Sequence, residues 1–218
     1  MMTQLYIGIY GASGFGKEVM PLVRQQYPHL SKEQFVFIDD GQAGTFLNSY
    51  PVLSYSIFLA NSSSEKAVTI AIANSKVREK LIDRLKQDNV KNIDVKASNV
   101  VILDEVQMGE GSLLCPFTCL TSNIKIGKFF HANIYSYVAH DCVIGDYVTF
   151  APGVKCNGNI HIEDHAYIGT GAVIKQGTPE KPLVIGKGAI VGMGAVVTKS
   201  VAAGTTVVGN PARILEKK

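Results

Sequence analysis

His140 and Asp141 are the neighbouring residues of this chain best suited to acid–base chemistry. They stand in the segment VAHDCVIGDY, residues 138–147. A carboxylate next to an imidazole raises its basicity and selects which ring nitrogen carries the proton. The pair therefore predicts a general base, His140, with Asp141 as its acidic helper. Adjacent residues need not face each other, so an ordinary surface histidine stays an open alternative.

The other four histidines have weaker signals. We expect His29 on the surface, and His131, His161 and His165 on outward positions of the repeat described below, at the surface or at an interface. Three neutral imidazoles meeting at an interface would bind zinc and activate water. His161 and His165 are a candidate pair for that purpose, but no third ligand stands out. We therefore predict no metal site.

A second candidate site is a glycine-rich segment near the start of the chain. Gly11, Gly14 and Gly16 form a GxxGxG pattern between an apolar run and a predicted helix. Glycine allows a backbone to approach a phosphate closely, and a helix N-terminus offers free N–H groups. Asp39 and Asp40 follow the next apolar run, where a carboxylate can bind a ribose hydroxyl in dinucleotide folds. The pattern predicts a nucleotide or nucleotide-sugar site; a tight turn without a ligand is the alternative.

The elements that position His140 follow from an apolar stripe that recurs every six residues, from Ile102 to Ile174. A second stripe of small or apolar residues runs four places later, from Val106 to Ala172. Neither a helix nor a plain strand keeps this period, whereas a hexapeptide repeat is typical of a β-helix. Three hexads make one triangular coil, so both stripes should line the interior of a prism. The register breaks after Ile174, which predicts a loop with five extra residues.

Residues 1–96 have a different pattern, in which short apolar runs alternate with helical segments. This alternation predicts a small α/β domain with a Rossmann-like parallel sheet, followed by an all-β β-helix domain over 97–218. The segment Gly41 to Tyr55 is predicted to be a surface loop, and the tail GNPARILEKK to end in a short helix. The predicted strands are Leu5–Tyr10, Phe35–Ile38, Ala67–Ala73 and Asn92–Val95, and the predicted helices are Lys17–Gln26 and one capped by Ser75 with Val77, Leu81, Ile82 and Leu85 on one face.

Composition excludes several classes of protein. The chain has 218 residues, 46% of them hydrophobic, and a net charge of +3, which is too small to indicate nucleic-acid binding. No apolar run approaches the roughly 20 residues of a membrane span, and no secretion signal is evident. Cysteines 115, 119, 142 and 156 show no paired spacing. We expect a reduced, cytoplasmic protein.

Several segments together resemble the NeuD-type sialic-acid O-acetyltransferases and their relatives, the bacillosamine-pathway UDP-4-amino-sugar N-acetyltransferases. The resemblance spans essentially the whole chain. It implies a left-handed β-helix, a homotrimer with active sites between subunits, acetyl-CoA as cosubstrate and no permanently bound cofactor. The segments that carry it are YGASGFGKEV, FIDD, AIAN, AHDCVIGDYVTFAPGVKCNGNIHIEDHAYIGTGAVI and VVGNPAR.

The resemblance also implies roles for individual residues. His140 matches the family's catalytic base and Asp141 its helper. The remaining matches divide into two groups, a substrate group for the UDP-sugar and a group that contacts acetyl-CoA. The substrate group is Ser13, Gly14, Phe15, Asp39, Asp40 and Ala73, and the acetyl-CoA group is Thr149, Gly158 and Thr170.

These inferences favour an acetyl-CoA-dependent N-acetyltransferase that acts on the 4-amino group of a UDP-linked amino-deoxy sugar. The amine would attack the thioester directly, with His140 as base and the Gly158 N–H as the candidate oxyanion donor. An O-acetyltransferase acting on a sialic acid or glycan precursor is one alternative, and a non-catalytic nucleotide-sugar-binding trimer is another. The short first domain argues against a nicotinamide oxidoreductase.

Overall fold

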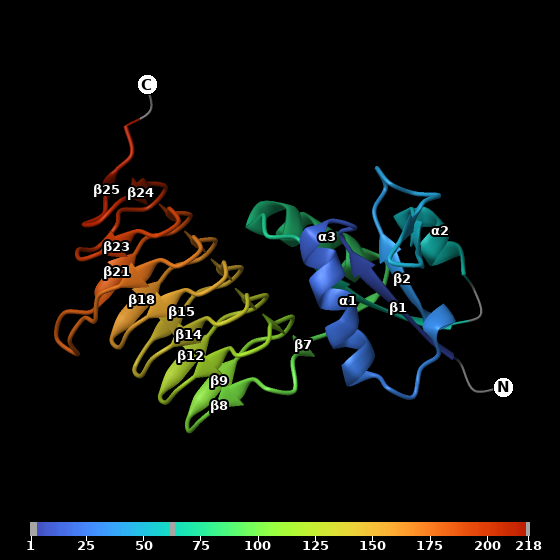
Figure 1. Cartoon of the computed structure of the whole chain (residues 1–218), viewed down its shortest axis with the longest axis horizontal. Coiled ribbons are helices and arrows are strands. Elements are labelled where there is room, and N and C mark those ends of the chain that lie inside the picture. The colour runs from blue at the N-terminus through green and yellow to red at the C-terminus, as the bar shows by residue number, and fades with distance from the viewer. Residues whose placement is uncertain (1–3, 62–63, 217–218) are drawn as a thin grey trace. The chain divides into compact units, whose positions relative to one another are not determined.

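The computed structural model describes residues 4–61 and 64–216 and divides the chain into two compact units, Met1–Val95 and Lys96–Lys218. The first unit is an α/β layer structure, and the second is a stack of triangular coils (Figure 1). Within the described residues, no helix is long and apolar enough to cross a membrane.

The first unit is built around a six-stranded sheet with the order β3-β4-β2-β1-β5-β6. All of its pairings are parallel except that of β3 with β4. Strand β2 is buried along its whole length, as expected of a parallel strand covered on both faces. The strands are β1 Gln4–Tyr10, β2 Phe35–Ile38, β3 Phe46–Leu47, β4 Tyr50–Leu53, β5 Ser64–Ile70 and β6 Lys91–Asn92, and the helices are α1 Gly14–Gln26, η1 Lys32–Gln34 (a 3₁₀ turn), α2 Tyr55–Ala60 and α3 Ser75–Gln87.

The structure corrects several expected boundaries in this unit. Helix α1 begins at Gly14, three residues before the expected Lys17, and contains Pro21 in its interior. Strand β5 ends at Ile70, before the expected Ala73. Asn74, not Ser75, caps α3, because its side-chain oxygen accepts from the backbone N–H groups of Lys76 and Val77.

The inner face of α3 also differs from the expectation. Val77 is exposed, while Arg78 is buried together with Ile82 and Leu85. Arg78 is accommodated because its guanidinium donates to two backbone carbonyls, those of Ile72 at 3.0 Å and Ala73 at 2.9 Å. A buried charge that finds such acceptors takes the place of an apolar residue.

The predicted surface loop over Gly41 to Tyr55 is wrong. Strands β3 and β4 form an antiparallel pair there, and β4 joins β2 in the parallel sheet. Tyr50 and Val52 are buried and alternate with the partly buried Pro51 and Leu53. This period-2 alternation is the strand signal that the many Gly, Asn and Ser residues around it obscured.

The second unit is a left-handed β-helix whose coils repeat every 18 residues. Leu113 pairs with His131, and His131 with Thr149. The strands form three faces, each a parallel sheet. The eight-stranded face ends in one antiparallel strand, β25. The eight-stranded face contains β7 Val95–Lys96, β10 Leu113–Leu114, β13 His131–Ala132, β16 Thr149–Phe150, β19 Tyr167–Ile168, β22 Ile190–Val191, β24 Thr206–Val208 and β25 Arg213–Ile214.

The other two faces have six and five strands. The six-stranded face contains β8 Val101–Ile102, β11 Cys119–Leu120, β14 Tyr137–Val138, β17 Lys155–Cys156, β20 Val173–Ile174 and β23 Val196–Val197. The five-stranded face contains β9 Val106–Met108, β12 Ile124–Ile126, β15 Val143–Ile144, β18 Ile160–Ile162 and β21 Leu183–Ile185.

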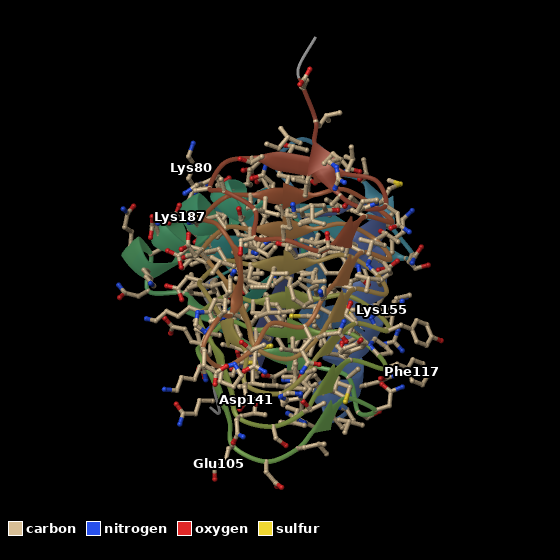
Figure 2. All side chains as sticks on the ribbon, turned by 90° about the vertical axis from the view of Figure 1, so that its left-hand side faces the viewer. Lys80, Glu105, Phe117, Asp141, Lys155 and Lys187 are labelled. Carbon is tan, nitrogen blue, oxygen red and sulfur yellow. The ribbon has the colours of Figure 1, made fainter. Side chains whose placement is uncertain are left out.

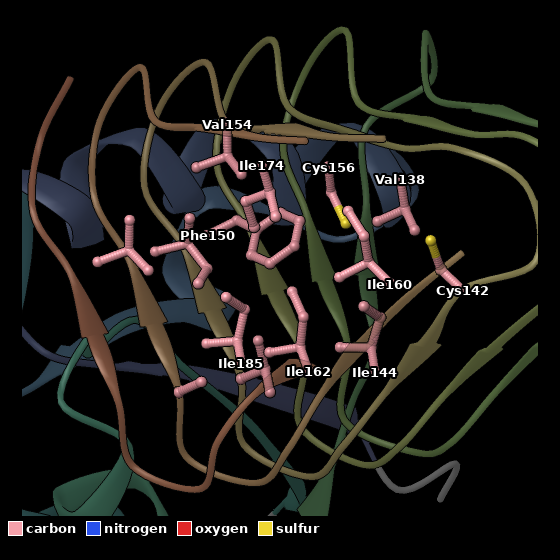
Figure 3. Packing of buried hydrophobic residues seen from close by; sticks show 14 of the residues in the cluster. Val138, Cys142, Ile144, Phe150, Val154, Cys156, Ile160, Ile162, Ile174 and Ile185 are labelled. Carbon is pink, nitrogen blue, oxygen red and sulfur yellow. The ribbon is translucent and has the colours of Figure 1, made fainter. Parts of the chain in front are cut away.

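Both predicted stripes line the interior of the prism. Val138, Cys156 and Ile174 follow one another up the six-stranded face and belong to one buried cluster (Figure 3). The stripe is more exposed at its start, where Ile102 is 37% and Met108 36% exposed. These residues belong to the first coil, which has no preceding coil to cover them. The tail is a short strand, β25, and not the expected helix.

Between residues 105 and 171, every corner of the prism places one residue in the left-handed backbone region, again with a period of six. Such a conformation is uncommon for a residue with a side chain, and each short corner of this coil contains one. From Glu105 to Gly171 the residues with positive φ are Glu105, Gly111, Phe117, Asn123, Phe129, Tyr135, Asp141, Tyr147, Gly153, Asn159, His165 and Gly171, and Gly188, Gly194 and Gly204 follow after the inserted loop. We call the corner between the six-stranded and five-stranded faces the Asp141 edge; it holds Glu105, Asn123, Asp141 and Asn159.

Candidate functional site

His140 and Asp141 face each other on the Asp141 edge, just after strand β14. His140 Nδ1 lies 2.7 Å from Asp141 Oδ2, and the two side chains are 48% and 46% exposed. The backbone anchors both residues to neighbouring coils, because Asp141 donates its N–H to Ser122 and His140 accepts from Asn159. The predicted base and helper are thus in contact at the surface of the prism.

The negative charge of Asp141 determines which ring nitrogen of His140 carries the proton. The hydrogen bond with His140 is the largest cause that lowers the pKa of Asp141, and a hydrogen bond from Asn123 lowers it further. An ionised carboxylate only accepts hydrogen bonds, so Nδ1 of His140 must carry the proton. The Nε2 lone pair is then free to accept a proton from a ligand.

Gly158 lies one coil above His140 and provides the space for its ring. A Cβ atom at position 158 would lie 2.5 Å from Cε1 and 2.6 Å from Nε2 of His140. No real Cβ tolerates such contacts, so any side chain there would displace the imidazole. The structure therefore brings together His140, the predicted base, and Gly158, a residue of the predicted acetyl-CoA group.

Two polar residues beside this pair were missed by the sequence analysis. Tyr137 donates its hydroxyl hydrogen to Asn157 Oδ1 at 2.8 Å, and Asn157 donates to the Ile174 carbonyl at 2.7 Å. Burial raises the pKa of Tyr137, which keeps it a hydrogen-bond donor. Counting 18 residues from the neighbours of His140 would have found Asn157, since it stands one coil above Ala139.

A pocket of about 550 Å³ lies at the later end of the Asp141 edge. Gln176 follows Gly158 by one coil, and Lys199 follows Gln176 after the inserted loop, because Ile174 pairs with Val197 across that loop. The pocket contains three lysines and three hydroxyl side chains, a composition that favours anions. Its lining residues are Lys175, Gln176, Gly177, Thr178, Lys181, Pro182, Leu183, Thr198, Lys199 and Ser200.

Thr149 and Thr170 do not join His140 within one chain. Thr149 lies on β16 and is 5% exposed, and it follows His140 by nine residues, half of an 18-residue coil. It therefore stands on the opposite side of the triangle. Thr170 is exposed at the turn between the eight-stranded and six-stranded faces. The tertiary structure thus separates the acetyl-CoA group into Gly158 beside His140 and two threonines elsewhere.

The expectation that His131 and His165 lie at the surface is wrong. Their side chains are 3% and 9% exposed, whereas His161 is exposed. His165 is covered because it stacks on Tyr147 with parallel rings 5.1 Å apart, and Tyr147 stacks in turn on Phe129. Within residues 4–61 and 64–216, no cluster of three or more His, Cys, Asp or Glu side chains is arranged to hold a metal ion. The four cysteines are free thiols.

In the first unit, the glycine-rich segment forms the turn from β1 into α1. Gly11 has a φ of 111° and donates its N–H to Ile38 at the end of β2. A Cβ at Gly16 would lie 2.0 Å from the Gly11 carbonyl oxygen, so the close turn requires glycine there. Ser13 is the N-cap residue, and Gly14 and Phe15 open the helix. The first-turn N–H groups of α1 therefore point out of the carboxyl end of the sheet.

Asp39 and Asp40 lie at the same end of the sheet, directly after β2. Asp39 accepts hydrogen bonds from the backbone N–H groups of Ala12 and Gly41, at 3.2 and 3.0 Å. Asp40 accepts from the Tyr55 N–H at 2.8 Å and lies 3.8 Å from Arg84. Both carboxylates hold the loops that surround the glycine-rich turn.

Ala73 and Arg84 complete this end of the first unit. Ala73 follows β5, and its carbonyl accepts from the buried Arg78. The guanidinium of Arg84 stacks over the Tyr55 ring at 4.2 Å. Burial raises the pKa of Tyr55, whose hydroxyl also hydrogen-bonds to Asp88. The predicted residues Ser13 to Phe15, Asp39, Asp40 and Ala73 all follow the carboxyl ends of β1, β2 and β5, where ligands of parallel sheets bind.

The chain is similar to one family model and to several known proteins. Residues 6–85 match the PglD N-terminal domain. The sequence is 52% identical over 212 residues, 96% of both chains, to GDP-perosamine N-acetyltransferase from Escherichia coli O157:H7. WeeI from Acinetobacter baumannii AYE has a TM-score of 0.96 and 80% identity, covering 97% of this chain and 100% of that one. The acetyltransferase domain of PglB from Neisseria gonorrhoeae FA1090, in complex with acetyl coenzyme A, has a TM-score of 0.82 and 27% identity, covering 98% and 100%.

Proposed function

Because this chain belongs to the family of sugar N-acetyltransferases that act on nucleotide-linked amino sugars with acetyl-CoA, we propose that its acceptor is the 4-amino group of a UDP-linked amino-deoxy sugar. The family membership confirms the predicted acyltransferase activity. The same membership favours N-acetylation over the three alternatives, which were an O-acetyltransferase, a non-catalytic nucleotide-sugar-binding trimer and a nicotinamide oxidoreductase. The contact of His140 with Asp141 on the edge of the β-helix is the observation that supports acyl transfer, and the glycine-rich turn beside Asp39 supports a nucleotide-linked acceptor.

His140 serves as the general base in this proposal. A sugar amine is largely protonated near neutral pH and attacks a carbonyl only through its free lone pair. Nε2 of His140 takes up the proton, either from the ammonium group or from the adduct as the C–N bond forms, and the thiolate of CoA then leaves. General-base assistance of this kind contributes about 10²–10⁴-fold. The thioester is already activated, so the reaction needs no covalent intermediate on the protein.

Gly158 has a second role in this mechanism. Among the described residues, its N–H donates to no backbone carbonyl, and it stands beside the imidazole. We assign it to the oxyanion that develops when the amine attacks the thioester. A preorganised N–H at this place stabilises negative charge more in the transition state than in the ground state.

The Asp141 edge is also the track that we propose for acetyl-CoA. The column His140, Gly158, Gln176 and Lys199 leads from the base to the lysine-lined pocket, which suits the phosphates of the coenzyme. Thr149 and Thr170 would reach the same coenzyme from a neighbouring copy, because they lie on other sides of the triangle. The proposal therefore includes a homotrimer with its acetyl-CoA sites between subunits.

Replacing Lys175 and Lys199 together with glutamine tests this track. We expect the KM for acetyl-CoA to rise about three- to tenfold with little change in kcat, since each exposed ion pair contributes modestly. The effect should be largest at low salt. The control substrate is acetyl-pantetheine, which lacks the phosphates of acetyl-CoA. Its KM should be the same for wild type and the double variant. An equal loss with both substrates would contradict the assignment.

Replacing Asp141 with asparagine is expected to lower kcat about tenfold, less than the loss of the base itself. The amide no longer selects the Nδ1–H form of His140 and no longer stabilises the imidazolium. Because the pKa of Asp141 is lowered, its carboxylate stays ionised as pH falls below the ordinary range of an aspartate. In wild type the carboxylate is therefore ionised throughout pH 5 to 8, and initial rates of CoA release over this range compare wild type and variant without titration of Asp141. A variant with a wild-type rate and pH profile would contradict the role.

The first unit holds the nucleotide in this proposal. The glycine-rich turn with Ser13, Gly14 and Phe15 suits a diphosphate, and Asp39, Asp40 and the Ala73 backbone suit the nucleoside. The free thiols and the need for acetyl-CoA support a cytoplasmic location.

A GDP-linked amino sugar is the second candidate substrate, because the relative with 52% identity is named a GDP-perosamine N-acetyltransferase. Release of CoA from acetyl-CoA with matched UDP-linked and GDP-linked 4-amino sugars separates the two. A kcat/KM at least about tenfold higher for the UDP-linked sugar supports the first candidate. A preference for the GDP-linked sugar supports the second, and activity with neither contradicts both.

A further inference from the structure

The Asp141 edge carries different residue types from the other two edges. Elsewhere, the left-handed corner positions hold glycines or aromatic rings that stack along the prism, as Phe117 does on Tyr135 at 4.8 Å. On the Asp141 edge, the same positions hold Glu105, Asn123, Asp141 and Asn159. Figure 2 shows Glu105 and Asp141 on one side of the prism and Phe117 on another. This polar ladder runs along the edge that carries the predicted base.

Asn123 contacts Asp141 from the coil below. Its Nδ2 donates to Asp141 Oδ1 at 3.3 Å, while the other carboxylate oxygen, Oδ2, faces His140. The backbone fixes the spacing of these two coils, since Asp141 donates its N–H to the Ser122 carbonyl. Asn123 is itself held to the preceding coil, because its N–H donates to the Asp104 carbonyl. Asp141 is thus held at both oxygens, one by each neighbour.

We propose that Asn123 is a positioning residue that holds the Asp141 carboxylate in the orientation needed to align His140 for proton uptake. This inference rests on the proposed role of His140 as base. The half-exposed carboxylate would otherwise rotate about its Cβ–Cγ bond and divide its oxygens between the imidazole and water. An amide donor suits the task because it orients the carboxylate without adding a competing charge. The lowered pKa of Asp141 agrees with a donor at Oδ1.

Asparagine at this position serves the backbone as well, so the test must separate the two roles. The φ of Asn123 is 58°, a conformation that glycine, asparagine and aspartate tolerate better than other residues. Asn123→Gly keeps the backbone and removes the donor. Asn123→Asp keeps the shape but places a second carboxylate against Asp141. Glu105→Gly is the matched control, because it lies at the same edge with a φ of 56° and belongs to the first coil.

We expect Asn123→Gly to lower kcat about three- to tenfold, the effect of losing one hydrogen bond, with both KM values unchanged. Asn123→Asp should lower kcat further, while Glu105→Gly keeps the wild-type rate. If Asn123 served only the backbone, all three variants would behave alike.

Imidazole ¹⁵N shifts of His140 give a readout that a purely structural role would not move. Wild type should show one tautomer with the proton on Nδ1, and Asn123→Gly a mixture of two. A wild-type kcat or an unchanged tautomer in Asn123→Gly would overturn the inference. A fully active His140→Ala would instead overturn the proposed function, so the two failures are distinguishable.

Discussion

Replacing His140 with alanine is expected to lower kcat for sugar acetylation by at least about 10²-fold while the fold stays intact. The loss follows because Nε2 is the proposed proton acceptor, on an imidazole whose Nδ1 lies 2.7 Å from the Asp141 carboxylate. The fold should survive because the side chain is half-exposed and stands outside the interior stripes. Steady-state release of CoA with a nucleotide-linked amino sugar measures the change.

His140→Asn is the companion variant, since it is polar, fits the same space and cannot accept a proton near neutral pH. It should be as slow as His140→Ala, and both should retain wild-type melting temperatures and the KM for acetyl-CoA. Near wild-type turnover in either variant would remove His140 from the role of base. A parallel loss of melting temperature would instead trace the slow rate to the fold.

Replacing Gly158 with alanine is expected to lower kcat about 10- to 100-fold, an effect of one added carbon. The new Cβ would occupy the space of the imidazole, 2.5 Å from Cε1, so the ring must move. A displacement of about 1 Å at a reacting group can cost about 10²-fold. Alanine keeps the backbone N–H, and Gly158 is not among the residues with positive φ, so the backbone itself is not strained. The variant therefore isolates the position of the base from the oxyanion donor.

The double variant Gly158→Ala with His140→Ala is the control for this prediction. If the added methyl group acts only by displacing the ring, it has no effect once the ring is gone, and the double variant should match His140→Ala alone. A further loss in the double variant would show that position 158 acts on the reaction independently of His140. Unchanged turnover in Gly158→Ala would show that the ring is not held where the structure places it.

The sequence alone predicted the interior of the β-helix and the contact of His140 with Asp141 on its edge. The six-residue period identified the buried stripes because only side chains at fixed places in each hexad point inward. The adjacent His140 and Asp141 do meet as expected. An 18-residue coil even implies that Gly158 follows His140 and that Asn123 precedes Asp141 along one edge. Local order along the chain and a fixed repeat are enough for these conclusions.

The period was less informative for outward side chains. His131 and His165 sit at outward positions but are buried, and the stack of His165 on Tyr147 depends on neighbouring coils. The separation of Thr149 from His140 likewise follows from the triangular cross-section. In the first unit, the β3–β4 pair and the Asn74 cap were missed, because local propensities there compete with partners distant in sequence.

Sequence by itself thus determined which residues face the core and which imidazole and carboxylate could act together, since the first follows from a regular repeat and the second from two neighbouring residues. Only the tertiary structure decided that Gly158 leaves space for the imidazole, that Asn123 donates to the second oxygen of Asp141, and that three lysines gather further along the same edge. The physical reason is that these are contacts between coils. They depend on the direction of side chains at left-handed corners and on the path of an inserted loop, which a repeat period does not specify.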